Sequence, residues 1–183
     1  MAAPGSRADA IFVFAGSQER KEFGVQMWRR GDAPALVVSV GRFDWRRYGL
    51  LGLPGDDALR LAVERVPPPE RHFLVVLEGR EASVIGVPLH RFGTRNEARA
   101  LAALIEGRGW KRVIVISSAF HLRRVALTVG RALRGSGVAA AYAALPAERD
   151  RYRAGLWWRS PRGIRFVLGE FLKLAIYRVL LKP

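Results

Sequence analysis

The sequence predicts an α/β protein built on a doubly wound, mainly parallel sheet with helices on both faces. Two observations lead to this prediction. Continuous apolar runs of strand length recur along the chain, as expected for strands that are buried on both faces. A stretch with helical spacing follows most of these runs, and this alternation is typical of parallel sheets because helices make the crossover connections.

The first βαβ unit is the clearest part of the pattern. Residues 10–15 form a continuous apolar run that ends at Gly16, and residues 35–40 repeat it before Gly41. The intervening residues 17–30 have the length of a helix. The remaining expected elements are a helix at 54–66, a strand at 72–77, a helix at 94–107, a strand at 112–117, a helix at 119–134 and a strand at 138–144. We expect the βα alternation to hold throughout.

A chain of 183 residues favours one domain, and we assign residues 1–183 to it. Within this domain we expect residues 145–163 to be an irregular, basic segment that contains tryptophan. Residues 164–181 then form an amphipathic C-terminal helix. Four charged residues interrupt this apolar stretch, and residues 1–10 lack the apolar run of a signal peptide. We therefore expect a cytoplasmic or peripherally membrane-associated protein.

The composition limits the possible chemistry. The chain has 31 Lys and Arg against 16 Asp and Glu, and no cysteine. The absence of cysteine excludes disulfides, thiolate metal sites and cysteine nucleophiles. The net charge of +15 favours an anionic partner, such as nucleic acid, a phosphorylated metabolite or a membrane surface. An alternative is a compositional preference for arginine, because 27 of the 31 basic residues are Arg.

Small and polar residues follow three of the predicted strands. In parallel sheets ligands bind beyond the carboxyl ends of the strands, where glycine allows close approach and helix starts offer N–H groups to anions. The alternative is that such turns favour Gly and Ser without any ligand. Neither GxGxxG nor the Walker A pattern is present, which disfavours ordinary dinucleotide and nucleotide triphosphate sites. The candidate residues are Gly16, Ser17, Ser39, Gly41, Ser117 and Ser118.

Two further segments carry candidate polar chemistry. His121 and Arg124 lie on one face of the helix after the strand at 112–117, where they would act on an anion. The alternative is a helix capped by a serine with His121 packed in its side. Thr94 and Glu97 have the spacing of a capping box, and they would also face the crevice if the strand order places them beside His121. No histidine pair has zinc-site spacing and no GxSxG motif occurs, so we expect no metal and no classical serine hydrolase.

Several short motifs follow one another in a fixed order from about Asp9 to Tyr177. They are Asp9 to Gly16, Arg20, Gly31 to Pro34, Ser39 to Gly41, Gly86 to Pro88, Thr94 to Ala98, Val113 to Ser118, Phe120 with His121, Arg124, Trp157 to Arg159, Glu170 and Tyr177. This ordered set resembles the bacterial YdcF-like family, a domain of unknown function shared with the envelope proteins SanA and ElyC. The resemblance implies a three-layer Rossmann-like fold, and cell-envelope association for some members.

The resemblance also implies a site. One member of the family is reported to bind S-adenosylmethionine, so this cofactor is an expectation here. The family's polar positions map onto Asp9, Gly16, Arg20, Ser39, Gly41, Thr94, Glu97, Ser118, His121 and Arg124. This chain departs from the pattern at Val40, where glycine is commoner, and at residues 88–93, which lack the usual acidic and Asn positions. It also begins almost directly at its first strand, whereas SanA-like and ElyC-like members have N-terminal membrane segments.

From these features we expect a site for an anionic small molecule that bears phosphate or a nucleotide, S-adenosylmethionine and a lipid-linked phosphate included. The catalytic candidates are His121, Glu97 and Asp9, which would suit a hydrolase or transferase acting on a phosphorylated substrate. Arg20 and Arg124 would hold negative charge. Both a catalytic and a non-catalytic role remain open at this stage.

The alternative function is a basic module that binds a membrane surface or nucleic acid without catalysis. Nine basic and three acidic residues fall between positions 145 and 183, where Trp157 and Trp158 precede the last helix. Such a composition suits a membrane-surface anchor, although the helix would equally pack on the sheet. Residues 42–48 interleave arginine with aromatic residues. We interpret them as a lid over the anionic ligand, and a nucleic-acid contact would have the same composition.

Overall fold

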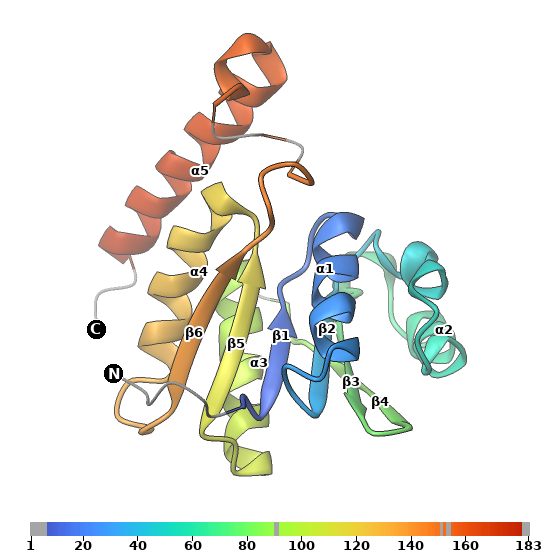
Figure 1. Ribbon diagram of the computed structural model, residues 1–183. Coiled ribbons are helices and arrows are strands. Elements are labelled where there is room, and N and C mark those ends of the chain that lie inside the picture. Colours follow the sequence, from blue (N-terminus) through green and yellow to red (C-terminus); the bar gives the residue numbers. More distant parts are fainter. Residues whose placement is uncertain (1–6, 90–91, 151, 153–154, 181–183) are drawn as a thin grey trace.

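A six-stranded sheet lies at the centre of the computed structural model, with strand order β4-β3-β2-β1-β5-β6 (Figure 1). The structure describes residues 7–89, 92–150, 152 and 155–180. The strands are β1 (Ala10–Val13), β2 (Ala35–Val40), β3 (Phe73–Glu78), β4 (Glu81–Gly86), β5 (Arg112–Ser117) and β6 (Ala139–Ala144). Every strand expected from the sequence is present, and β4 is additional.

The sheet is mostly parallel, with two antiparallel pairs. β1 pairs in parallel with β2 and β5, and β5 pairs in parallel with β6. β3 is antiparallel to both β2 and β4. The expectation of βα alternation throughout is therefore wrong at β3 and β4, because only Gly79 and Arg80 connect them. A connection this short joins antiparallel strands only, and Gly79 supplies the positive φ of +63° that the tight turn uses.

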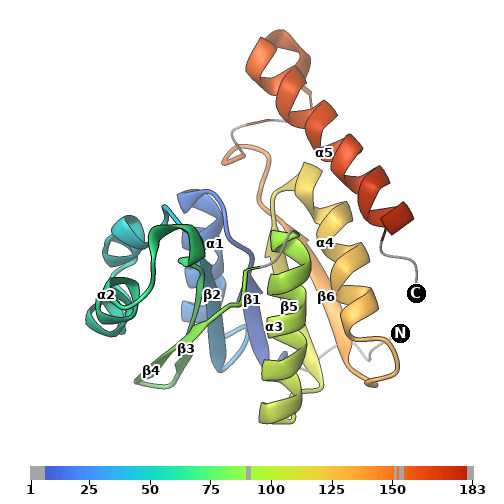
Figure 2. The same cartoon turned by 180° about the vertical axis from the view of Figure 1, so that it is seen from behind.

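Helices cover both faces of the sheet. Figures 1 and 2 show α1 (Gln18–Arg29) on one face and α3 (Gly93–Arg108) with α4 (Ala119–Ala132) on the other. α2 (Asp56–Glu64) and the 3-10 helix η1 (Trp45–Leu51) pack on the α1 side, at the β3–β4 end of the sheet. The short 3-10 helix η2 (Pro68–Glu70) leads into β3. This is a mixed α/β fold with a sheet between two helical layers.

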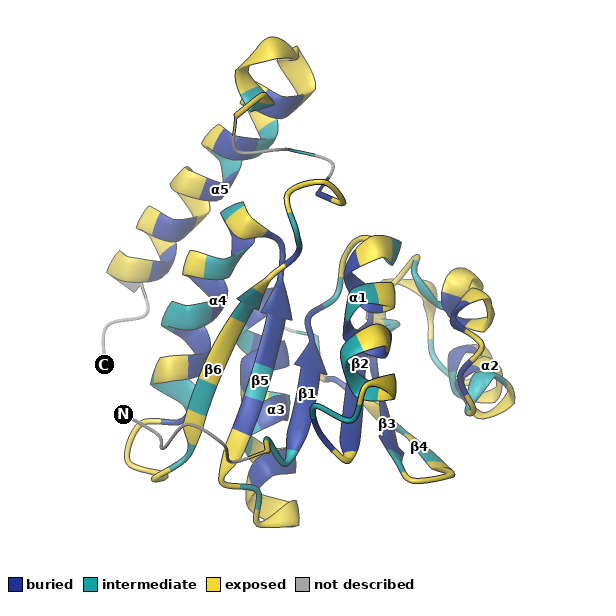
Figure 3. Cartoon of the chain, in the orientation of Figure 1, coloured by how far each residue is buried: buried dark blue, intermediate teal, exposed yellow. Residues whose placement is uncertain are grey.

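The strand side chains divide the core into two clusters. Ile11 and Val13 of β1 face the α1 side, whereas Phe12 and Phe14 face α3 and α4. All four are fully buried, which explains why the sequence of β1 is a continuous apolar run (Figure 3). On the α1 side the packing is close at Gly24, where an added Cβ would lie 2.3 Å from Val13 Cγ2.

Residues 42–48 do not form the free lid that we expected from their composition. Most of them belong to η1 or its approach, and Tyr48 is buried in the core, where its hydroxyl donates a 2.9 Å hydrogen bond to the Pro54 carbonyl. Asp44 forms a 2.9 Å ion pair with the buried Lys21 of α1. This segment is therefore anchored to the body of the protein through Asp44 and Tyr48, whereas Arg42, Phe43, Arg46 and Arg47 are exposed.

The C-terminal helix α5 (Pro161–Leu180) packs against α4 and extends beyond the edge of the sheet (Figures 1 and 2). It begins at Pro161, three residues before the expected start, because proline is well suited to the first helical position. The 3-10 helix η3 (Trp157–Arg159) precedes it, so the segment expected to be irregular contains a short helix. Residues 151, 153 and 154 of that segment lie outside the described residues. Among the described helices, none combines the length and apolar character that crossing a bilayer requires.

Candidate functional site

The candidate site lies at the edge of the sheet where the parallel strands end. β1, β2 and β5 finish there, which brings Ala15, Ser39 and Ser117 to one place. β3 begins at the same edge because it runs antiparallel to β2, and its preceding residue His72 therefore joins the group. The starts of α3 and α4 complete this edge.

Glu97 of α3 is the centre of a buried hydrogen-bond cluster. Its Oε1 accepts from the Ser39 hydroxyl at 2.6 Å and from the Ala15 N–H at 2.8 Å. Because Ser39 donates its proton to Glu97, the His72 Nε2–H is the donor in the 2.8 Å bond to Ser39 Oγ. Burial alone would raise the pKa of Glu97, but the hydrogen bond and charge of His72, with the bonds from Ser39 and Ala15, hold this pKa below its usual value.

His121 lies on the α4 side of the same edge. Its Nδ1 is 2.9 Å from Ser117 Oγ, and its Nε2 is 3.3 Å from Thr94 Oγ1. Burial, followed by the charges of Arg124, Arg20 and Lys173, holds the pKa of His121 well below its ordinary value. The imidazole is therefore neutral at pH 7, so one ring nitrogen donates a hydrogen bond and the other accepts one.

Arg124 connects α3, α4 and α5. It donates to Thr94 Oγ1, and its guanidinium forms a two-pronged pair with Glu170 of α5, the shortest distance being 2.8 Å. Lys173 adds a second cation to Glu170 at 3.0 Å. The Arg124 guanidinium also lies 5.3 Å from the centroid of the Tyr177 ring. Both Arg124 and Glu170 are buried, whereas just over half of the Lys173 side-chain surface is exposed.

Arg20 has a structural position rather than the ligand-holding one that we expected. Its Nη1 donates to the carbonyls of Phe14 and Ala15, at 3.2 and 2.5 Å, and its Nη2 donates to Ser118 Oγ at 2.8 Å. An added Cβ at Gly16 would lie 2.8 Å from this guanidinium, so glycine leaves room for it. Arg20 thus ties the turn after β1 to the start of α4.

An open cavity of about 480 Å³ lies between the starts of α3 and α4 and the middle of α5. Thr94, Glu97, His121 and Arg124 contribute its polar wall, and all four are residues that the sequence predicted. The cavity is lined by Ala15, Phe92, Gly93, Thr94, Glu97, His121, Arg124, Lys173, Ile176 and Tyr177. Arg124, Lys173 and the start of α3 therefore meet at one opening.

The capping-box interpretation of Thr94 and Glu97 is wrong. α3 begins at Gly93, one residue earlier than expected, and Phe92 at its N-cap position makes no side-chain capping bond. Thr94 is therefore inside the first turn, and its hydroxyl contacts His121 and Arg124 instead. Glu97 points across to β1 and β2. The alternative that we left open, in which both side chains face the crevice, is what the structure shows.

The remaining predicted residues divide into two groups. Ser118 lies at the start of α4, Gly41 lies beside Ala15, and Ser17 lies exposed at the start of α1. Asp9 lies at the opposite edge, before β1, where its Oδ2 accepts from the N–H groups of Lys111 and Arg112. Asp9 is therefore separated from the cavity by the length of β1, and we remove it from the catalytic candidates.

Sequence reasoning missed His72, Glu170, Lys173 and Tyr177 as site residues. His72 opens an apolar strand, and its role depends on the antiparallel direction of β3. Glu170 is the one acidic residue on a helix otherwise rich in apolar and basic residues, and this is the signal that could have indicated a buried partner for a cation. Within the described residues, no group of three or more His, Asp and Glu side chains is arranged to hold a metal ion.

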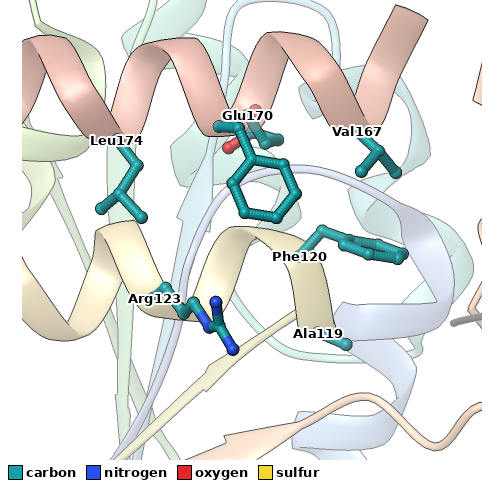
Figure 4. A pocket seen from close by; sticks show the side chains of 7 residues that line it. Ala119, Phe120, Arg123, Val167, Glu170 and Leu174 are labelled. Carbon is teal, nitrogen blue, oxygen red and sulfur yellow. The ribbon is translucent and has the colours of Figure 1, made fainter. Parts of the chain in front are cut away.

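A smaller slot of about 200 Å³ lies between α4 and α5, beside the cavity. Val167 and Leu174 of α5 point toward α4 there, opposite Phe120 (Figure 4). Arg123 lies at its α4 side. The slot is mainly apolar and is a gap in the α4–α5 packing, so we do not include it in the candidate site.

Comparison of the chain with family models, with curated proteins and with solved structures gave no match.

Proposed function

We propose that the cavity between α3, α4 and α5 binds a small molecule through a phosphate group. The observation that supports this proposal is the meeting of Lys173, Arg124 and the first turn of α3 at one opening. The negative charge of Glu97 does not oppose the ligand strongly, because Ser39, His72 and the Ala15 N–H already surround that carboxylate. Lys173 is the cation with most freedom to reach a ligand, since its side chain is half exposed.

We include in this proposal the fold relationship, the family, the ligands and the cellular location that the sequence predicts. A Rossmann-like relationship is supported by the parallel strands β2, β1, β5 and β6, whose carboxyl ends border the site. Membership of the YdcF-like family and a role in the cell envelope rest on the order of motifs in the sequence alone. S-adenosylmethionine and a lipid-linked phosphate are candidate ligands on the same basis. A cytoplasmic or membrane-peripheral location belongs to the proposal as well.

His121 gives the site the means to move a proton. Its neutral imidazole borders the cavity and contacts Thr94 and Ser117, so a ring nitrogen can take up a proton from a bound ligand or water. Hydrolysis or transfer at a bound phosphate would use His121 in this role. Arg124 and Lys173 would stabilise the charge that develops on the phosphate oxygens.

A thermal-shift screen tests the proposal. The panel contains phosphorylated metabolites, S-adenosylmethionine and polyprenyl phosphates, added to the wild type and to His121→Ala and Lys173→Met. We expect at least one phosphate-bearing compound to raise the Tm of the wild type by several degrees, since ligand at about a hundred times its Kd stabilises by about 2.7 kcal/mol. Both variants should respond less, because each removes a side chain that lines the cavity.

Arg178→Met is the matched control, because Arg178 is an exposed cation on α5 that does not line the cavity. It should respond as the wild type does. The proposal fails if no phosphate-bearing compound shifts the Tm. It also fails if Lys173→Met and Arg178→Met lose the response equally, since the charge of α5 in general would then explain the effect.

A further inference from the structure

α5 has two apolar faces, and only one of them is covered. The covered face follows helical spacing along the contact with α4. It consists of Gly163, Val167, Glu170, Leu174 and Tyr177, all of which are buried. This narrow stripe accounts for the packing of the helix on the rest of the protein, and it leaves most of the helix surface in contact with solvent.

The opposite face of α5 is apolar and exposed. Leu168, Phe171, Leu172 and Val179 are each more than half exposed, at 57, 52, 64 and 62%. Ile164 and Ile176 extend the same face at 38 and 37%. Large apolar side chains gathered on one face of a helix are unlike the scattered apolar residues of an ordinary protein surface, and they mark an interaction site. Phe171 also lines the slot between α4 and α5, so it lies at the margin of this face. We call these six residues the outer face of α5.

The charges around the outer face have one sign. Arg162, Arg165, Lys173 and Arg178 are the basic residues of α5, and all four are exposed. Helical spacing places Arg165 within the outer face, close to Leu168 and Leu172, and the other three beside it. The acidic residue of the helix, Glu170, is buried against α4 and paired with Arg124. A second copy of the chain that packed outer face to outer face would bring these cations together. A surface with negative charge and an apolar interior complements them.

We propose that α5 docks this protein on an anionic lipid bilayer, with the helix in the plane of the interface. The outer face would enter the boundary between headgroups and acyl chains, and the cations beside it would contact the lipid phosphates. Arg165, which lies on the face itself, would extend its long side chain to the headgroups. The outer face runs from Ile164 to Val179, which gives a contact about 23 Å long. The buried stripe keeps α5 attached to α4 at the same time, so docking needs no rearrangement of the fold.

The proposal goes beyond the phosphate site and does not depend on it. Docking would nevertheless affect the phosphate site, because Lys173, Ile176 and Tyr177 of α5 line its cavity. A helix lying at the bilayer surface would hold the cavity opening close to the lipid headgroups. A ligand could then reach the site from the bilayer or from solution.

Vesicle co-sedimentation with the full chain tests the docking surface. The vesicles contain phosphatidylcholine alone or phosphatidylcholine with phosphatidylglycerol, at low and high salt. The test variant is the double change Leu168→Asp with Leu172→Asp. The matched control is Leu61→Asp, since Leu61 is an equally exposed leucine (55%) on α2, outside the outer face. Both changes are on the surface, and thermal melting checks that each variant is folded.

We expect the wild type to sediment with phosphatidylglycerol vesicles, less so at high salt, and weakly with phosphatidylcholine alone. The double change should weaken partitioning by about a hundredfold, because each leucine buried in the interface contributes about a factor of ten or more. Leu61→Asp should partition as the wild type does. The proposal is overturned if the wild type remains in the supernatant, or if the double variant and Leu61→Asp sediment alike. It is equally overturned if light scattering shows a wild-type dimer that the double change dissociates while vesicle binding is absent.

Discussion

A neutral His121 among three cations makes the stability of this protein sensitive to mild acid. Burial and the charges of Arg124, Arg20 and Lys173 hold its pKa well below the usual 6.5 in the folded protein, whereas the unfolded chain has the usual value. Below pH 6.5 the unfolded state therefore binds a proton that the folded state does not bind. Stability is lost as the pH falls from 6.5 toward the folded pKa.

We predict that His121→Asn reduces the dependence of the unfolding free energy on pH below 6.5. Urea unfolding of the wild type should show a fall in unfolding free energy below pH 6.5, and the variant should show a smaller one. NMR titration of the imidazole signals provides a direct check, since the signal lost in His121→Asn should titrate well below 6.5. A signal that titrates near 6.5 would contradict the neutral state of His121.

Glu97 gives the opposite case of a carboxylate that the fold keeps ionised. Its pKa lies below the usual 4.5, so its contribution to stability is full above about pH 4.5 and is lost as the pH falls through the folded pKa. Glu97→Gln should remove this acid sensitivity and destabilise the protein at pH 7 by about 1–3 kcal/mol, because its charge-assisted hydrogen bonds weaken. Denaturant unfolding at pH 7 and pH 4 measures both effects. An unchanged pH profile would show that Glu97 is not the group responsible.

Only some residues of the candidate site could be predicted from the sequence. Thr94, Glu97, His121 and Arg124 could be found because each belongs to a short segment with a local polar pattern. His72 could not, since its partner Ser39 is 33 residues away and only the tertiary fold brings them together. Glu170 had a local signal, as the one acidic residue of its helix, but its partner Arg124 is 46 residues away. Asp9 was included through the family resemblance, although its place before β1 already puts it at the edge opposite the carboxyl ends of the parallel strands.

The contact between α4 and α5 depends on one buried carboxylate. Glu170 pairs with the buried Arg124 and with the exposed Lys173. Glu170→Ala should destabilise the protein by about 3–5 kcal/mol, because it leaves the Arg124 charge buried without its partner. Lys173→Met should cost less than about 1 kcal/mol, since an exposed ion pair contributes little. Urea unfolding of the two variants distinguishes them, and equal losses would mean that Arg124 does not depend on Glu170.

The close approach of α1 to β1 is a second contact between elements that a matched pair can test. Gly24→Ala places a Cβ 2.3 Å from Val13 Cγ2, and overpacking of this kind costs about 1–3 kcal/mol. A Cβ added at Gly130 of α4 would have no other atom within 4 Å. Gly130→Ala should therefore stabilise the folded protein by about 0.5–1 kcal/mol, because alanine has the higher helix propensity. Opposite shifts in Tm are expected. A Gly24→Ala protein as stable as the wild type would contradict the packing of α1.

The strands and helices were predicted well where the apolar pattern of the sequence extends over a whole element. β1 and β2 are buried on both faces, and β5 is buried except at Arg112 and the half-buried Ile114. All three are continuous apolar runs in the sequence, and the helices that follow them have clear stops. β4 was missed because it is an edge strand whose side chains are largely exposed, so Glu81 and Ser83 interrupt any apolar run. The antiparallel direction of β3 could not be predicted without β4, because the two-residue turn at Gly79 is recognisable only when both of the strands it joins are known.

The protein has its buried polar cluster at one edge of the sheet and a large exposed apolar surface on α5. The sheet order brings the ends of β1, β2 and β5 together with the starts of α3 and α4. α5 contributes to the cavity with one side and leaves its outer face uncovered. This arrangement could not be predicted from the sequence, because the amphipathic pattern of α5 does not show which of its two apolar faces packs on α4.

The most direct test of the phosphate site is an NMR titration of the ¹⁵N-labelled protein with inorganic phosphate at constant ionic strength. We predict saturable shifts of the amide signals of Gly93, Thr94 and Ala15, because these residues line the cavity. The same titration of Lys173→Met should need higher phosphate concentrations. The absence of saturable shifts would contradict the account. Shifts confined to the opposite edge, around the surface cavity lined by Trp110 and Gly135, would contradict it as well.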